Sequence, residues 1–311
     1  MLLLFLSFWL IQWLFLKTKE MCMSKNKLLL GSHVGFKAKN YLVGSVLETL
    51  EYDGNCFMVF TGPPQNFMRK ELDQNLIDEA VKLMKEKNPL LLENIVVHAP
   101  YLINLGSPKE STRSLGLNQL IVEINRTNQI HSKLIVLHPG SALDSDRNVA
   151  INHIADNLNK AIEATDNDVI ICVETMAGKG SEVGINFEEV SKIVSGVKNK
   201  KRIGVCLDTC HMHDSGIDIS DPDQTLEEFS KYLDLSYIKV IHLNDSKNEI
   251  GSRKDRHDNI GYGKVGFDYL VKWAHNEKLA NVPKILETPY RDDKPIYKQE
   301  IINLNSKEWK E

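Results

Sequence analysis

The chain has 311 residues, which is enough for two ordinary domains or for one large single-core architecture such as an α/β barrel. It is 42% hydrophobic and 26% charged, with no biased tract in its body, and this composition excludes a disordered or fibrous protein. The net charge of −4 weighs against a nucleic-acid-binding protein, since such proteins are usually basic. Bound cations would change that balance.

The cysteines are odd in number and scattered, which does not suit a disulfide framework and indicates a reducing compartment. They lie at Cys22, Cys56, Cys172, Cys206 and Cys210. We therefore expect a cytoplasmic protein, associated with the nucleoid if DNA is its partner. Within apolar runs such as CFMVF and GVCLD, a cysteine is usually a small buried hydrophobic residue.

The N-terminus begins with MLLLFLSFWLIQWLFL, an apolar run with no preceding charge and no small-residue cleavage site. It is slightly short for a membrane span. Three interpretations are open: a membrane anchor, an atypical targeting signal, or upstream sequence that precedes a true start at Met21 or Met23. We favour the last, and we predict an extension over residues 1–22 and one catalytic domain over residues 23–311.

From residue 27 onward, short apolar runs alternate with amphipathic helical patterns. The expected strands are 27–33, 56–62, 94–100, 133–140, 169–175, 202–209, 238–245 and 283–289. The expected helices are 72–87, 117–130, 152–164, 187–198, 226–233 and 267–278. Eight such units predict a single (β/α)8 TIM barrel. A doubly wound open sheet is the alternative, but no glycine-rich phosphate loop follows the first strand.

Metal-binding residue types recur near the carboxyl ends of six of the eight expected strands, which is where a TIM barrel builds its active site. They are His98, His138, Glu174, Asp208, His242 and Glu287. Any one of them could be a satisfied core histidine or a carboxylate that caps the next helix. Six at equivalent positions predict a shared site. His33 also ends a strand, but a core position suits it equally well.

The segment CLDTCHMHD holds six side chains that can bind a metal: Cys206, Asp208, Cys210, His211, His213 and Asp214. His211 can face the same site as Asp208 if the chain is helical there. In RKDRHDN, Asp255 and His257 fall on one side if that loop is extended. The five histidines and four carboxylates then suit zinc first and manganese next, in a cluster of two or three ions. We expect both cysteines to be bystanders.

Several stretches resemble signature segments of the endonuclease IV family, the zinc-dependent apurinic/apyrimidinic endonucleases with a TIM barrel. They are VHAPYLINLGSP, LHPGS, ETMAGKGSEVG, CLDTCHMHD, IHLNDSK, RKDRHDNIGYG and ILETPY, and they run in order from about Leu28 to Tyr290. Such a multi-part match is far more specific than one short motif.

The resemblance implies three zinc ions, whose ligands carry over position by position. His98, His138 and Glu174 would hold the first; Glu174, Asp208, His242 and Glu287 the second; His211, Asp255 and His257 the third. A hydroxide between the first two ions would be the nucleophile, since zinc lowers the pKa of bound water towards about 7. Glu174 and Glu287 are the predicted catalytic residues.

The implied substrate is double-stranded DNA with an abasic site, cleaved on its 5′ side to leave a 3′-hydroxyl and a 5′-deoxyribose phosphate. Trimming of blocked 3′ ends is a further expected activity. Tyr101 and Leu102 match two residues that wedge into the duplex, although ordinary loop packing also explains them. Where some family members carry an arginine wedge, this chain has Gln65, and we expect Arg69 to compensate.

Two other functions are open from the sequence alone. A two-metal TIM-barrel sugar or sugar-phosphate isomerase or epimerase would share Glu174, Asp208, His242 and Glu287, but it has no need for His211, Asp255 or His257. A metal-stabilised scaffold protein would bind without turnover. No protein partner is indicated, a monomer is expected, and a membrane is involved only if residues 1–16 act as an anchor.

Overall fold

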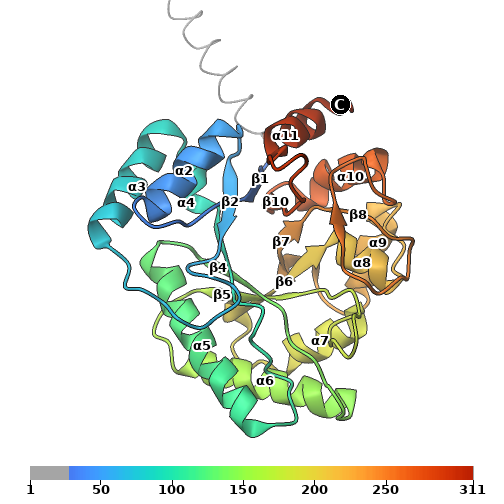
Figure 1. Cartoon of the computed structure of the whole chain (residues 1–311). Coiled ribbons are helices and arrows are strands. Elements are labelled where there is room, and N and C mark those ends of the chain that lie inside the picture. Colours follow the sequence, from blue (N-terminus) through green and yellow to red (C-terminus); the bar gives the residue numbers. More distant parts are fainter. Residues whose placement is uncertain (1–27, 311) are drawn as a thin grey trace, which may run out of the picture.

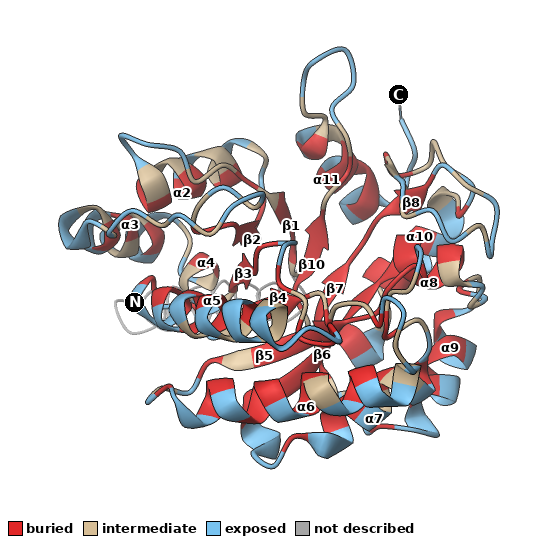
Figure 2. Ribbon diagram, turned by 60° about the horizontal axis from the view of Figure 1, so that its bottom comes forward, coloured by how far each residue is buried: buried red, intermediate tan, exposed pale blue. Residues whose placement is uncertain are grey.

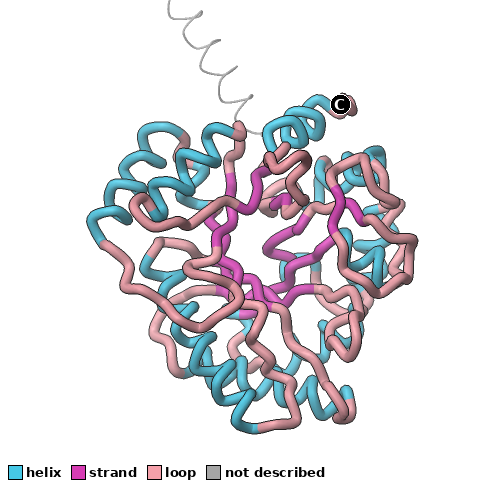
Figure 3. Tube along the Cα trace, viewed as in Figure 1, coloured by secondary structure: helices cyan, strands magenta, loops and turns pink. Residues whose placement is uncertain are grey.

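The computed structural model describes residues 28–310, so the predicted extension over residues 1–22 lies outside the described part. Eight parallel strands close into a barrel in the order β1-β10-β7-β6-β5-β4-β3-β2. Figure 3 shows these strands as a ring inside a shell of helices. The strands are β1 (Leu30–His33), β2 (Cys56–Val59), β3 (Ile95–His98), β4 (Leu134–Leu137), β5 (Ile170–Glu174), β6 (Ile203–Asp208), β7 (Ile238–His242) and β10 (Lys284–Leu286). The predicted TIM barrel is confirmed, and the open-sheet alternative is excluded.

The helices cover the outside of the barrel and turn their apolar faces towards the strands (Figures 1 and 2). The predicted helices correspond to α3 (Gln74–Lys87), α5 (Glu110–Gln129), α6 (Arg147–Glu163), α7 (Phe187–Gly196), α9 (Pro222–Ser230) and α10 (Phe267–Ala274). Four of them start at a capping side chain: Asp73, Asp146, Asn186 and Asp221 accept hydrogen bonds from backbone N–H groups of the first turn.

In the described part of the chain, the sequence patterns missed three α-helices and one small sheet. The α-helices are α2 (Tyr41–Glu51), α4 (Leu90–Glu93) and α11 (Tyr297–Ser306), whereas the helical turn considered after Asp208 is present as α8 (Thr209–Ser215). No side chain caps α2, α4 or α11, and α4 is too short to show helical periodicity. The sheet pairs β8 (Asp245–Ser246) with β9 (His257–Asp258) in antiparallel fashion. Two-residue strands have no sequence period, so only the folded chain shows them.

The barrel interior is filled by a layer of apolar side chains. The layer consists of Cys56, Met58, Val96, Val136, Cys172, Cys206, Val240 and Ile285, all fully buried. Successive side chains of a strand point to opposite faces, so the residue two positions later points into the barrel again, closer to its mouth. The interior layer therefore fixes which residues line the mouth. Among residues 28–310, no helix is long and apolar enough to cross a membrane.

Candidate metal centre

The six metal-binding side chains on the strands lie directly above the apolar interior layer. Each follows an interior residue by two positions, as His98 follows Val96 and Glu174 follows Cys172. Four of the six are completely buried or nearly so, while His138 and Glu287 reach the cavity with side-chain exposures of 20% and 12%. Strand alternation thus brings the predicted set to one end of the barrel.

The expected turn after Asp208 is the helix α8, and it places His211 against the same site. The Asp208 side chain caps this helix, since Oδ1 accepts a hydrogen bond from the His211 N–H at 2.8 Å. Its other oxygen, Oδ2, lies 3.7 Å from both His242 Nδ1 and His257 Nε2. Capping and metal binding, which the sequence presents as alternatives, are therefore compatible in this one carboxylate.

The loop that carries Asp255 and His257 reaches the site by a different route from the one predicted. It is not extended throughout, because Arg253 and Asp255 adopt left-handed φ values of 56° and 55°. Asp214, fully buried in α8, holds this loop: its Oδ2 accepts the Asp255 N–H at 2.8 Å, and its carbonyl accepts the Arg253 N–H at 2.8 Å. His257 is placed by its pairing in β9.

The nine predicted residues come together as three groups, and within each group the ligand atoms lie within 4.8 Å of one another. In the first, His98 Nε2 and His138 Nε2 lie 3.3 and 3.1 Å from Glu174 Oε2. In the second, His242 Nδ1 lies 2.9 Å from both Glu174 Oε1 and Glu287 Oε2, with Asp208 beside them.

In the third group, Asp255 Oδ1 lies 3.0 Å from His211 Nε2 and 3.6 Å from His257 Nε2. The three groups have the same membership as the three ligand sets that the family resemblance implies. The described structure therefore contains groups that could hold metal ions, and Glu174 belongs to the first two.

Backbone carbonyls orient three of the imidazoles. Nδ1 of His98, His211 and His257 lies 2.7, 2.9 and 3.2 Å from the carbonyl oxygens of Ala99, Thr175 and Glu287. A carbonyl can only accept, so each Nδ1 carries the proton and each Nε2 keeps its lone pair for the centre of the site. This outer contact is the usual arrangement of a metal-binding histidine.

Burial and charge in the site oppose each other strongly. Burial would raise the pKa of Glu174, but the imidazoles of His242 and His138 hold this pKa well below its ordinary value. Burial would lower the pKa of His211, but Asp208 and Asp255 raise it well above its ordinary value. Buried carboxylates thus require positive partners, which are protons on imidazoles when no cation is bound.

One buried ring nitrogen fits the same interpretation. His257 Nε2 has no hydrogen-bond partner among the described residues. Such orphaned polar atoms are rare in a folded protein, and a bound ion is a standard explanation. For His257 the free nitrogen points to the third group, because its Nδ1 is already engaged by the Glu287 carbonyl. The donor set of imidazole nitrogen and carboxylate oxygen suits zinc or manganese.

A cavity of about 370 Å³ opens above the cluster. Tyr101, Lys179 and Glu182 line it together with six of the nine predicted ligands. The Tyr101 ring packs against the rings of His98 and His138, with centroid distances of 5.4 and 5.3 Å. Tyr101 and Leu102 remain 48% and 50% exposed at the rim, so both are accessible to a large substrate.

The loop between β2 and α3 changes the interpretation of Arg69. Gln65 is exposed, as a contact residue must be. The Arg69 side chain, however, is only 5% exposed: its Nε donates to Glu123 at 2.5 Å, and its Nη1 donates to three carbonyls of its own loop. The Arg69 side chain is therefore already used to hold its own loop, and its predicted compensation for a missing arginine wedge stays a prediction. Met68, 81% exposed on the same loop, was missed.

The residues that connect the ligands were also missed. Asn244 Nδ2 donates to Asp208 Oδ2 at 2.8 Å, and Asn244 Oδ1 accepts the Glu287 N–H at 2.8 Å. Asp214 and Asn244 lie in the segments CLDTCHMHD and IHLNDSK, but no periodicity distinguishes a supporting side chain from a ligand. Their role depends on contacts between residues far apart in the sequence.

The two cysteines of CLDTCHMHD lie beside the ligands, and each can be grouped with two of them by distance. Both are fully buried. Burial raises the pKa of Cys206 to about 12 and also raises that of Cys210, so both remain thiols, whereas a metal binds the thiolate. Their predicted role as bystanders is consistent with this chemistry.

Comparison with known proteins agrees with the fold and the site. The family described as xylose isomerase-like TIM barrel matches residues 47–307. The protein is therefore a TIM barrel of that class with a candidate metal centre at its mouth. A D-tagatose 3-epimerase-like protein has a TM-score of 0.64 at 18% identity, covering 89% of this chain and 99% of its own, and it shares the fold alone.

Closer relatives identify the family. The probable endonuclease 4 of Acholeplasma laidlawii is 50% identical over 276 residues, which cover 88% of this chain and 94% of the relative. The crystal structure of endonuclease IV from Thermus thermophilus has a TM-score of 0.77 at 28% identity and covers 89% of this chain and 96% of its own. The chain belongs to the endonuclease IV family and is, by that membership, a phosphodiester-hydrolysing endonuclease.

Proposed function

We propose that this DNA-repair endonuclease hydrolyses the phosphodiester on the 5′ side of an abasic site in double-stranded DNA, leaving a 3′-hydroxyl and a 5′-deoxyribose phosphate. One observation carries the proposal: nine imidazoles and carboxylates meet at the mouth of the barrel in three groups, in a chain of the endonuclease IV family. Trimming of blocked 3′ ends would use the same site. We further propose that residues 23–311 act as a monomeric domain in the cytoplasm.

Three zinc ions would occupy the three groups. His98, His138 and Glu174 would hold the first, and Glu174, Asp208, His242 and Glu287 the second. His211, Asp255 and His257 would hold the third. When bound, zinc supplies Lewis acidity and a water whose pKa is lowered towards about 7. The third group distinguishes this proposal from a two-metal isomerase, which would leave His211, Asp255 and His257 without a task.

The side chains around the cluster have separate tasks. Glu174 keeps two groups in one geometry, because its two oxygens face different imidazoles. Glu287 reaches the cavity, where its carboxylate lies 2.9 Å from His242 Nδ1, and it would orient an attacking water. Lys179, at the cavity wall, can bind a phosphate oxygen of the substrate.

Recognition of an abasic site requires the duplex to be bent and the gap to be filled. Tyr101 and Leu102, which are exposed, would fill the gap in the base stack. On the β2–α3 loop, Gln65 and the apolar Met68 are exposed, and methionine is among the side chains that wedge between base steps.

The test is incision of a duplex with a single tetrahydrofuran site by the full-length protein, with zinc counted in the same sample. We expect cleavage immediately 5′ to the site and about three zinc ions per chain. A protein that holds its metals but leaves this duplex intact would overturn the proposal. Substitution of His211 by Ala separates the two candidate enzymes, since only the endonuclease needs the third group.

A further inference from the structure

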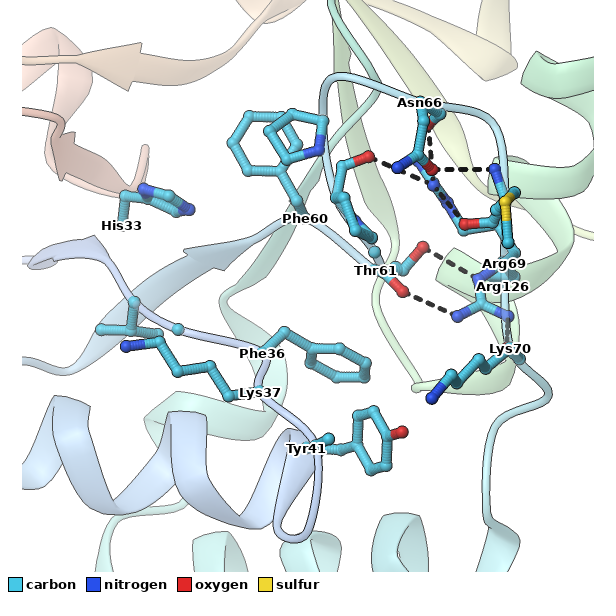
Figure 4. A pocket seen from close by; sticks show the side chains of 17 residues that line it. His33, Phe36, Lys37, Tyr41, Phe60, Thr61, Asn66, Arg69, Lys70 and Arg126 are labelled. Carbon is cyan, nitrogen blue, oxygen red and sulfur yellow. Dashed lines mark hydrogen bonds between the residues drawn. The ribbon is translucent and has the colours of Figure 1, made fainter.

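A second cavity, of about 580 Å³, lies beside the metal centre and has no part in the function proposed above. It is enclosed by the segment between β1 and α2 and by the segment between β2 and α3 (Figure 4). Its volume is within the usual range for a small-molecule site.

Aromatic rings form two of its walls. Phe36 and Tyr41 pack together on one side, with a centroid distance of 5.4 Å, while His33 and Phe60 pack edge to face on the other at 5.1 Å. Figure 4 shows the Phe36 and Tyr41 rings facing the open space from below and His33 and Phe60 bordering it from above. A planar, aromatic ligand suits such walls, because rings stack or meet edge to face.

The charge around the cavity has one sign. Four cationic side chains line it and no carboxylate does; they are Lys37, Arg69, Lys70 and Arg126. Glu123, behind the wall, neutralises Arg69, but Arg126 and the exposed Lys37 and Lys70 have no carboxylate within ion-pair distance among the described residues. Nη2 of Arg69 is buried without a hydrogen-bond partner in the described part of the chain, which leaves an unsatisfied donor in the wall.

The cavity adjoins the metal centre at the Phe60 side chain. The Phe60 ring lies 4.9 Å from the His98 ring and 5.2 Å from the Tyr101 ring, centroid to centroid, and its other side faces the cavity. A ligand in the cavity would therefore lie next to DNA that is bound at the cluster. Met68, the exposed apolar residue of the β2–α3 loop, also lines the cavity.

We propose that this cavity binds an unstacked nucleobase of the bound DNA, with its ring against Phe36 and Phe60 and its phosphate near Lys37 or Lys70. The inference rests on the proposed function, because the base is supplied by a duplex that the rim residues have opened. Aromatic walls and cationic surroundings match a nucleotide, which offers a planar ring and an anionic phosphate.

The wall is already formed without a ligand. Arg69 Nη1 donates to the carbonyls of Pro63, Asn66 and Met68, and Arg126 Nη2 donates to the Thr61 carbonyl at 2.7 Å. Both arginines thus hold the β2–α3 segment around the cavity. A preformed site loses little conformational entropy on binding.

The experiment is a double-mutant cycle in which one change is made in the protein and the other in the DNA. Single-turnover incision is measured on a duplex with one tetrahydrofuran site and on duplexes that lack, in turn, one further base opposite or next to that site. Phe36→Ala should raise the half-maximal protein concentration by roughly 5- to 100-fold, the range for loss of one base–aromatic stack. On the one duplex that lacks the bound base, the same substitution should have almost no effect.

Matched variants control for folding and for charge. Phe36→Leu keeps the bulk and loses the aromatic face, so it should reproduce most of the effect at an unchanged melting temperature. Tyr232→Ala removes an exposed aromatic ring between α9 and β7, at the opposite end of the barrel, and should change nothing. Lys37→Ala should lower the salt dependence of binding by about one ion, whereas Lys201→Ala should not.

Two results would overturn the inference. One is a Phe36→Ala effect that is equal on every duplex, or absent. The other is that deoxynucleoside monophosphates inhibit the wild type, that Phe36→Ala relieves this inhibition, and that removing any single base from the duplex changes nothing. The occupant of the cavity would then be a free nucleotide and not a base of the bound DNA. If the wild type incises no duplex, the proposed function fails by itself. Fluorescence anisotropy of the uncut duplexes then still tests the cavity.

Discussion

The inside of the barrel and its mouth are built by the same strands, two residues apart, yet they are chemical opposites. The interior layer holds Cys172, Val96 and other small apolar side chains, all fully buried and without charge. The next inward positions hold Glu174, His98 and the other ligands carried by strands, most of them also buried. The difference is not exposure to water, because both layers are largely dry.

What differs is how the free energy of burial is balanced. Apolar side chains contribute favourably to folding when buried. Carboxylates and imidazoles have an unfavourable burial energy unless opposite charges meet them at short range. The mouth meets this condition with a network of short contacts that cations can replace, and the apolar layer beneath keeps water from entering below the cluster.

The largest effect is expected at the carboxylate shared by two groups. Glu174→Gln keeps the shape but removes the charge that faces His138 and His242, and we expect incision to fall by roughly 10³-fold or more, about 4 kcal/mol in activation free energy. Bound zinc, counted by mass spectrometry, should fall below three per chain. Glu163→Gln on the surface of α6 is the control; equal zinc and activity in both variants would contradict the assignment.

A smaller loss should follow from removing the carboxylate that holds the Asp255 loop. Asp214→Ala frees the N–H of Asp255 and should lower metal affinity or incision by about 10- to 100-fold, as for other residues that orient ligands. One zinc should be lost more easily than the others when a chelator is titrated. Asp218→Ala, exposed just after the same helix, should behave as wild type. Uniform loss of all metals would argue against a local role.

Stability should respond to Lys284, a buried charge on β10 that meets no carboxylate among the described residues. Burial lowers its pKa to about 8. The unfolded chain, with a lysine pKa of about 10.4, binds more protons between pH 8 and 10.4, so the stability rises with pH through this window. Lys284→Met should therefore be more stable than wild type by roughly 3 kcal/mol at pH 7, and the gain should vanish near pH 10.5.

Urea unfolding of wild type and Lys284→Met at pH 7 and pH 10.5 measures this difference. Lys239→Met, on the neighbouring strand β7 but only partly buried, is the control and should show little change between the two pH values. A gain that is the same at both pH values would mean that packing, and not the buried charge, is responsible.

The smallest effect is expected at the rim. Met68→Ser removes an exposed apolar side chain that stabilises no part of the fold, and it should raise KM for abasic DNA by about fivefold, or about 1 kcal/mol, with kcat unchanged. Leu115→Ser, on the exposed side of α5, is the matched control. An equal change in both variants would remove Met68 from the DNA-contact surface.

Much of the fold and of the candidate site could be predicted, because each strand and the ligand at its end form a single sequence pattern. Runs such as IVVH and IICVE have the continuous apolar character of barrel strands, and the polar residue at their end marks the mouth. Helices with an acid or amide cap were also predictable, as at Asp73 and Asn186. The uncapped helix α2 and the two-residue strand β9 have no comparable signal.

Two local features of the site that the sequence does not show have one physical origin. Arg69 lies in a polar loop and has the chemistry of a DNA contact, but a buried carboxylate from α5, Glu123, pairs with it. Asp255 was expected in an extended loop, whereas Asp214 holds it in a left-handed conformation. Both outcomes depend on partners more than forty positions away in the chain.

The sequence by itself determined the barrel and the six metal-binding residue types at its strand ends, because strand periodicity is a local property that two positions suffice to express. Only the tertiary structure decided which oxygen of Asp208 caps a helix and which faces the cluster, which imidazole nitrogen keeps its lone pair, and which carboxylate pairs with Arg69. It also created the aromatic cavity beside the centre. Those features arise from contacts between distant segments, whose geometry no local pattern records.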